Sequence, residues 1–204
     1  MNIVANEMLS AILQVIFIGG VPLMLYTAWH KLRHKRSLRE IRTRAGLVVG
    51  DASMLRYAIG FAILSTLVSI FFPPPMEFLT EAEGSPHLKM VGLGWASDAW
   101  AIAVAYGVIK TGLTEELLFR GLLTGSLQRR MSMWVANLLQ TLIFFVPHLL
   151  MVIYLAPDLW GILPRLVIGS LVMGWIRMKS GSILGPWIIH AAANTTIAMV
   201  VATQ

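Results

Sequence analysis

The chain has no cysteine and few charged residues. Charged residues make up 13% of its 204 residues and hydrophobic residues 57%, whereas a soluble domain is about 25% charged and about 45–50% apolar. Without cysteine, the chain can form no disulfide, no thiolate zinc site and no cysteine nucleophile. The shortage of charge excludes a soluble protein with a large core and indicates an integral membrane protein.

Six apolar segments are candidate membrane spans, and the first of them is long enough to cross, since a helix needs about 20 residues to span a hydrocarbon core of about 30 Å. We therefore expect an all-α fold, a polytopic transmembrane helical bundle of about six spans. We expect the third span to continue beyond Arg120 as an amphipathic helix at the inner membrane surface. The expected spans cover approximately residues 8–29, 55–72, 91–120, 133–155, 163–178 and 183–202.

The net charge of +6 is concentrated in the loop that follows the first span. By the positive-inside rule, we expect the basic loop 31–44 to be cytoplasmic, in a multi-pass protein of the cell membrane with both termini outside. We do not expect nucleic acid as a partner, because the loop has no interleaved aromatic residues and lies between two spans. The lipid bilayer is the expected partner, and its anionic headgroups suit this loop. The basic residues of the loop are Lys31, Arg33, Lys35, Arg36, Arg39, Arg42 and Arg44.

Two adjacent glutamates, Glu115 and Glu116, interrupt the third apolar segment, and Arg120 follows them. Charges at bilayer depth are costly unless they are paired or line a wet cavity, so they indicate a functional site. Glu116 and Arg120 share a helical face and can form an ion pair. Glu115 points about 100° away from Glu116 and can contact a different partner. The alternative is a structural ion pair with one spare glutamate near the membrane surface.

The fourth apolar segment contains His148, four residues after Phe144. A lone histidine in an apolar helix is more often a packing residue than a catalytic one. However, Glu115 and His148 lie equally far in sequence from the turn near Met131 and Ser132. Two antiparallel helices with a constant rise would place both side chains at the same depth. We therefore expect Glu115 and His148 to meet.

The last apolar segment contains His190 and Asn194, separated by three alanines. Small residues let helices approach closely and leave room for a ligand. The imidazole and the carboxamide offer hydrogen-bond donors of the kind that stabilise an oxyanion. The alternative is ordinary hydrogen bonding between helices. Combined with a carboxylate base, these groups meet the requirements of peptide hydrolysis, which are water activation and oxyanion stabilisation.

Three motifs in this order resemble the signature of the CPBP family of intramembrane proteases, which includes the CAAX prenyl endopeptidases. They lie in the C-terminal half of the chain, and the first 90 residues carry none of them. The motifs are Glu115-Glu116-x-x-x-Arg120, Phe144-x-x-x-His148 and His190-x-x-x-Asn194.

The resemblance implies a role for each matching position. Glu115 would be the general base that activates water, and His148 would help to orient that water. His190 and Asn194 would stabilise the oxyanion of the tetrahedral intermediate. The residues that would support the site are Glu116, Arg120 and Phe144.

The resemblance leaves two mechanisms open, since the family has been described both as metalloproteases and as metal-free glutamate proteases. We favour the metal-free mechanism, with no cofactor, and the chain has no His-Glu-x-x-His motif. The alternative is a zinc ion held by Glu115, His148 and His190, because two histidines and one glutamate form a known catalytic ligand set.

We expect residues 1–204 to form one membrane-embedded domain, with N-terminal spans in residues 1–90 and a catalytic core in residues 91–204. The expected function is intramembrane endopeptidase, acting on a membrane-tethered peptide or protein. One alternative is a non-proteolytic binding or immunity protein of the same fold. Another is a proton-coupled transporter, which is disfavoured because transporters usually contain internal repeats and this sequence shows none.

Overall fold

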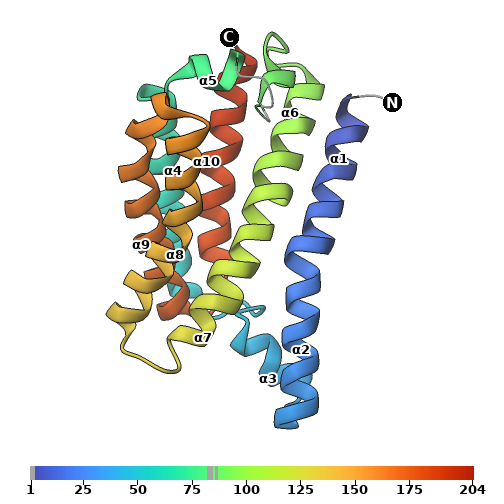
Figure 1. The fold of residues 1–204 in the computed structure, drawn as a ribbon, viewed down its shortest axis with the longest axis vertical. Coiled ribbons are helices and arrows are strands. Elements are labelled where there is room, and N and C mark those ends of the chain that lie inside the picture. Colours follow the sequence, from blue (N-terminus) through green and yellow to red (C-terminus); the bar gives the residue numbers. More distant parts are fainter. Residues whose placement is uncertain (1–2, 82–84, 86) are drawn as a thin grey trace.

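Long helices run side by side in the computed structural model of the protein, which describes residues 3–81, 85 and 87–204 (Figure 1). No strand occurs among these residues, and the predicted all-α fold is confirmed. The elements are α1 (Ile3–Gln14), η1 (Val15–Gly20), α2 (Val21–His34), α3 (Leu38–Arg44), η2 (Ala52–Met54), α4 (Leu55–Phe71), α5 (Met76–Glu81), η3 (Leu88–Met90), α6 (Ser97–Val104), η4 (Ala105–Leu113), η5 (Glu116–Thr124), α7 (Gly125–Leu127), α8 (Met133–Tyr154), η6 (Pro157–Ile162), α9 (Leu163–Ser180) and α10 (Leu184–Ala202).

The first helix is continuous from α1 through the π-helical segment η1 to α2. It ends at Lys35, which adopts a left-handed conformation with a φ of 53°. The short helix α3 then begins with a capping box, in which the Ser37 and Glu40 side chains each bond to the other residue's backbone N–H. This box satisfies two N–H groups that a helix start otherwise leaves unpaired, so the basic loop is a folded element.

The residues of the first motif lie on one unbroken helix that runs from Ser97 to Leu127, which we call the motif helix. It continues beyond Arg120 to Leu127, as the sequence predicted, and that this last part lies at the inner membrane surface stays a prediction. Two stretches of this helix, η4 and η5, are π-helical. Such segments are rare and often accompany functional sites, because they change which side chains share a face.

Five helices of the described residues are long and apolar enough to cross a membrane. The motif helix is not among them, since its ionisable residues lower its hydropathy. It nevertheless lies alongside the long helices (Figure 1) and contacts α1 on one side and α10 on the other. The polar character of the motif helix therefore depends on neighbours that shield it from lipid.

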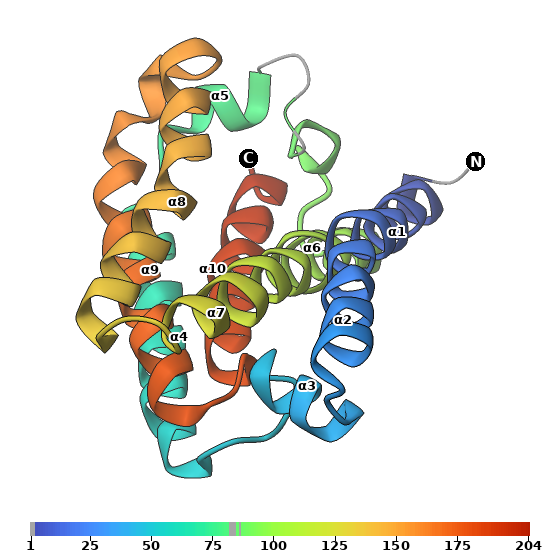
Figure 2. The same cartoon turned by 60° about the horizontal axis from the view of Figure 1, so that its bottom comes forward.

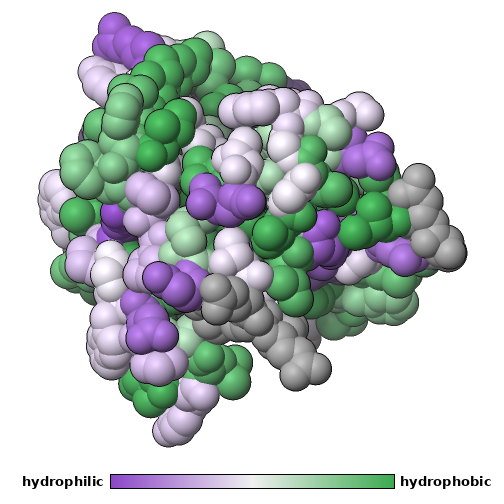
Figure 3. All heavy atoms as spheres, turned by 90° about the horizontal axis from the view of Figure 1, so that it is seen from above, coloured by the Kyte–Doolittle hydropathy of each residue, from purple (hydrophilic) through white to green (hydrophobic). Residues whose placement is uncertain are grey.

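The two chain termini lie at one end of the bundle, and α3 and α7 lie at the other (Figures 1 and 2). This is the arrangement that an even number of spans requires. Seen from the end that carries the termini, the surface mixes hydrophilic and hydrophobic residues (Figure 3). That the α3 end faces the cytoplasm stays a prediction.

The motif helix and α10 pack closely at Gly107. A Cβ atom at Gly107 would lie 2.5 Å from the Thr195 hydroxyl oxygen and 2.6 Å from the Thr195 backbone nitrogen. Only a residue without a side chain fits there, so the two helix backbones can approach each other. This approach sets the register in which polar residues of α10 face those of the motif helix.

Candidate active site

Glu116 lies at the centre of a buried polar cluster. Its Oε1 atom accepts hydrogen bonds from Nη1 of Arg120, at 2.8 Å, and from Nδ1 of His190, at 2.9 Å. Glu116 and Arg120 are fully buried, and His190 is 9% exposed. The predicted pairing of Glu116 with Arg120 is thus formed, and the same carboxylate connects the motif helix to α10.

Glu115 faces the opposite nitrogen of the same imidazole. Its Oε2 atom lies 3.7 Å from Nε2 of His190, which is too long for a hydrogen bond, and it has no hydrogen-bond partner although it is buried. The Glu115 side chain as a whole is 25% exposed. Glu115 therefore combines a partly accessible carboxylate with an unsatisfied oxygen beside a histidine.

His148 bonds to its own helix. Its Nδ1 atom lies 2.8 Å from the backbone oxygen of Phe144. Because a carbonyl can only accept, Nδ1 carries the proton and Nε2 is left as an acceptor. No hydrogen bond or ion pair joins Glu115 to His148 in the described part of the chain, so the polar contact expected between them is not formed. The imidazole is bonded instead to the backbone of Phe144, one turn earlier on the same helix α8.

The Phe144 ring lies at the meeting point of the motif residues. Its centroid is 4.6 Å from that of His148, 6.4 Å from that of His190 and 4.9 Å from that of Phe119. The Arg120 guanidinium lies 4.6 Å from the same centroid. Contact between a cation and an aromatic face is favourable when both are desolvated, so Phe144 both packs the two imidazoles and supports the arginine.

Arg120 makes further contacts that the sequence analysis missed. Its Nη2 atom donates to the Ser170 hydroxyl of α9 at 3.0 Å, and the Gln140 amide donates to the Ser170 backbone oxygen at 3.0 Å. Gln140 is fully buried. A signal for Gln140 was present, since residues 140, 144 and 148 follow each other at four-residue steps. Ser170 gave no such signal, because serine is common in apolar helices.

Asn194 is bonded to the motif helix through Thr111. Its Nδ2 atom donates to the Thr111 hydroxyl oxygen at 2.8 Å, and that hydroxyl donates to the Tyr106 carbonyl at 3.0 Å. Thr111 lies four residues before Glu115, as Asn194 lies four residues after His190. The two helices therefore match in register, and one of the two Asn194 N–H donors is already used.

The proposed metal ligands do not form a cluster. Within the described ranges, no three histidine, aspartate or glutamate side chains lie close enough together to hold a metal ion. Glu115 and His190 are adjacent, but His148 contacts Phe144 instead. As arranged, Glu115, His148 and His190 do not fit a three-ligand zinc site.

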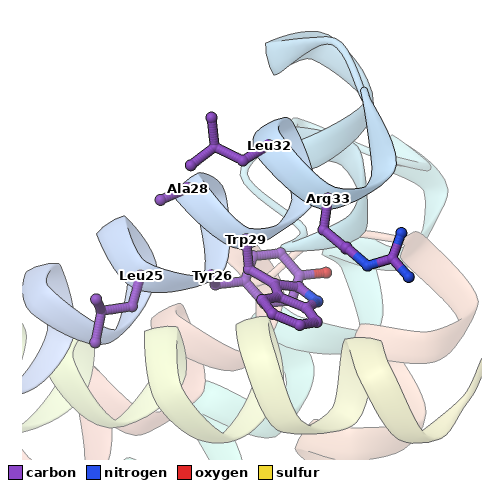
Figure 4. A pocket seen from close by; sticks show the side chains of 6 residues that line it. All are labelled: Leu25, Tyr26, Ala28, Trp29, Leu32 and Arg33. Atoms are coloured by element: carbon purple, nitrogen blue, oxygen red, sulfur yellow. The ribbon is translucent and has the colours of Figure 1, made fainter.

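An open hollow of about 770 Å³ lies along α2 and contains none of the motif residues (Figure 4). Most of its lining is apolar. We therefore locate the candidate active site by its ionisable groups and not by this hollow. The residues lining it are Leu25, Tyr26, Ala28, Trp29, Leu32 and Arg33.

Comparison with known proteins identifies a protein family. Residues 97–196 match the family model described as type II CAAX prenyl endopeptidase Rce1-like. The matched stretch begins with the motif helix and contains all three motifs, so the resemblance drawn from the motifs is confirmed. No curated protein and no solved structure matches the chain.

Proposed function

Residues 97–196 belong to the type II CAAX prenyl endopeptidase Rce1-like family, and from this premise we propose that the chain hydrolyses a peptide bond within the membrane. One observation carries the proposal. The Glu115 carboxylate has a buried oxygen with no hydrogen-bond partner, and this oxygen faces the imidazole of His190. A water molecule bound at this oxygen would satisfy it.

In the proposed reaction, Glu115 takes a proton from that water and the resulting hydroxide attacks the substrate carbonyl carbon. His148 suits the orientation of the water, because its Nδ1–H is bonded to Phe144 and its Nε2 can accept a hydrogen bond. Glu115 then returns the proton to the leaving amine as the C–N bond breaks. A carboxylate that acts first as base and then as acid satisfies the proton balance of the hydrolysis.

In this proposal, His190 and Asn194 of α10 stabilise the oxyanion. His190 is oriented by its Nδ1–H donation to Glu116, which leaves Nε2 facing Glu115. In its doubly protonated form His190 can donate from Nε2 to the oxyanion, and the charges of Glu115, Glu116, Arg120 and His190 then sum to zero. Asn194 adds its remaining N–H donor. Donors fixed in advance stabilise developing charge at little reorganisation cost.

Glu116 and Arg120 are proposed to position the site and not to react. Glu116 holds His190, and Arg120 holds Glu116, while Ser170 and Phe144 hold Arg120. A carboxylate bonded to the far nitrogen of a histidine fixes both its tautomer and its orientation. Each reacting group is thus supported by a second residue on another helix.

The proposed substrate is a membrane-tethered peptide or protein. A site on a motif helix shielded by membrane-spanning neighbours can be reached by a chain that is itself held in or at the bilayer. The family description reads CAAX prenyl endopeptidase, and for this chain we propose the broader class of membrane-tethered substrates. The proposed orientation places α3 in the cytoplasm; reporter fusions in the loop 31–44 should read cytoplasmic and fusions at Gln204 external.

The test replaces Glu115 by glutamine and His148 by alanine. Because the general base is lost, we expect Glu115→Gln to cleave about 10³-fold more slowly, and loss of the water-orienting imidazole to cost about 10²-fold. The matched control is Glu77→Gln, which removes an exposed carboxylate from α5. Substrates are identified first, as membrane peptides that stay uncut in cells carrying only the Glu115→Gln protein, and purified protein in detergent is then assayed on them.

Two results would overturn the proposal. Near-normal cleavage by Glu115→Gln would show that another group is the base. Full biological activity of that variant, with no cleaved product in the wild type, would indicate a non-proteolytic binding protein.

A chelation series tests separately whether cleavage requires a metal ion. We expect cleavage to survive exhaustive chelation because the three candidate ligands, Glu115, His148 and His190, do not converge.

A further inference from the structure

Arg177 is a buried arginine outside the three motifs. Its side chain is 1% exposed, and among the described residues it pairs with no carboxylate. Instead, Nε donates to the backbone oxygen of Arg120 at 2.8 Å, and Nη2 donates to the backbone oxygen of Arg44 at 3.1 Å. One guanidinium therefore connects the basic loop to the backbone of the residue that pairs with Glu116.

The position of Arg177 explains why the charge is tolerated. Arg44 is the last residue of α3 and Arg177 lies in the last turn of α9, whereas Arg120 lies within the motif helix, before its end at Leu127. The Arg44 carbonyl, at the C-terminus of α3, lacks an intrahelical partner and carries partial negative charge, so a cation is favourable beside it. The planar guanidinium can donate to the Arg44 and Arg120 carbonyls at once, which an ammonium cannot do with the same geometry.

Two glycines, Gly46 and Gly125, lie close against the Arg177 guanidinium. Gly46 has a φ of +70°, and a Cβ atom there would lie 2.6 Å from Nε of Arg177. A Cβ atom at Gly125 would lie 2.5 Å from the Arg44 oxygen and 3.2 Å from Nη2 of Arg177. Both glycines therefore permit close contact with the guanidinium.

We propose that Arg177 is a positioning residue for the hydrolysis, acting through the backbone of Arg120. The proposal rests on the function proposed above. Arg177 fixes the peptide group of Arg120, the Arg120 side chain fixes Glu116, and Glu116 fixes His190. A shift of Arg177, the first residue in this series of contacts, would move the His190 imidazole relative to Glu115. Displacements of about 1 Å at a reacting group can cost about 10²-fold in rate.

The first test compares two arginines on α9. Arg177→Lys keeps the charge but loses the double donation, and we expect kcat to fall about tenfold with KM within about twofold; Arg177→Met should lower kcat about 10²-fold. The matched controls, Arg165→Lys and Arg165→Met, alter an exposed arginine near the start of the same helix, and they should leave both parameters unchanged. A kcat about tenfold higher with lysine than with methionine separates positioning from simple loss of fold.

The second test displaces Arg177 without changing it. Gly46→Ala places a methyl group against the guanidinium, and we expect kcat to fall as in Arg177→Lys. The control is Gly92→Ala, where an alanine would be strained by a similar φ of +76° but the added atom would have nothing within 4 Å. Equal effects of the two glycine variants would mean that backbone strain, and not the position of Arg177, lowers the rate.

Hydrogen exchange measured by mass spectrometry gives a readout that does not need activity. In Arg177→Met, peptides covering residues 116–127 and 44–50 should exchange faster than in the wild type, and Arg165→Met should not change them. Unchanged exchange and unchanged kcat in Arg177→Met would overturn the proposal. A wild type that cleaves nothing would instead overturn the proposed function, while the exchange comparison would still report whether Arg177 holds Arg120 in place.

Discussion

Two buried groups of charges attach to the motif helix, and they are satisfied in different ways. The first, which we call the glutamate–histidine cluster, is Glu115, Glu116, Arg120 and His190. The second, which we call the lysine cluster, is Glu7, Lys89 and Lys110. In the lysine cluster each oxygen of the 1%-exposed Glu7 carboxylate bonds to a lysine, Oε2 to Lys89 and Oε1 to Lys110 at 3.2 Å. In the glutamate–histidine cluster, one oxygen of Glu115 and one oxygen of Glu116 are left without a partner.

The difference in how the carboxylate oxygens are bonded indicates a structural role for one cluster and a catalytic role for the other. A carboxylate whose oxygens are both bonded to fixed cations has little left to offer a substrate, and removing it leaves the cations uncompensated. A carboxylate with a free buried oxygen is costly to keep, and such costs are characteristic of functional sites. We therefore propose that the lysine cluster is structural and connects α1 to the motif helix. The glutamate–histidine cluster is the proposed reacting centre.

The largest effect on this comparison is expected from Glu7→Gln. Two lysines lose their carboxylate, and because both are partly exposed, at 30% and 17%, the free energy of unfolding should fall by about 3 kcal/mol, the low end for a broken buried pair. The protein that remains folded should still cleave. The measurement is thermal unfolding in detergent, run beside Glu115→Gln, for which we expect the reverse: a normal melting temperature and cleavage slowed about 10³-fold. Loss of cleavage in folded Glu7→Gln would remove the distinction between the clusters.

A smaller effect should appear as a pH dependence at the lysine cluster. His87 lies in the loop before the motif helix, and burial, together with nearby Lys89, lowers its pKa from 6.5 to about 4, against a small opposing effect of Glu7. Its ring packs on Tyr106 of the motif helix. Because the unfolded chain binds the proton more readily, stability is complete above pH 6.5 and is lost as the pH falls towards 4; between pH 7 and pH 5 the loss is about 2 kcal/mol.

The measurement is the free energy of unfolding at several pH values for the wild type and for His87→Phe. The phenylalanine cannot titrate and preserves an aromatic contact with Tyr106. We expect its stability to depend less on pH over this range. An unchanged pH profile would show that His87 is not the group responsible.

The smallest effect is expected from Thr111→Val, which tests the edge of the glutamate–histidine cluster. Valine has nearly the same shape but cannot accept the hydrogen bond from Asn194. The carboxamide then loses its fixed orientation, and we expect kcat to fall about tenfold, equivalent to about 1.4 kcal/mol. The isosteric change Thr196→Val on α10 is the control, since Thr196 bonds to the Ala192 carbonyl and to Thr66. Equal rates for wild type and Thr111→Val would show that the Asn194 carboxamide does not stabilise the oxyanion.

The sequence by itself determined the membrane-embedded helical class, the three motifs and the pairing of Glu116 with Arg120. These depend on composition and on contacts one helical turn apart, both of which can be read along the chain. It did not determine that His190 would lie between two glutamates, that Asn194 would bond to Thr111, or that Glu7 would take both lysines. Nor did it indicate that Arg177, which resembles an ordinary basic helix end, would hold the backbone of Arg120.

Those contacts depend on how far each helix is rotated and shifted against its neighbours. Close approach at Gly107 and the π-helical stretches of the motif helix set that rotation and register. A π segment changes the face on which every later side chain lies, and no spacing rule based on 3.6 residues per turn anticipates it. The tertiary structure alone therefore decided which of the polar groups meet.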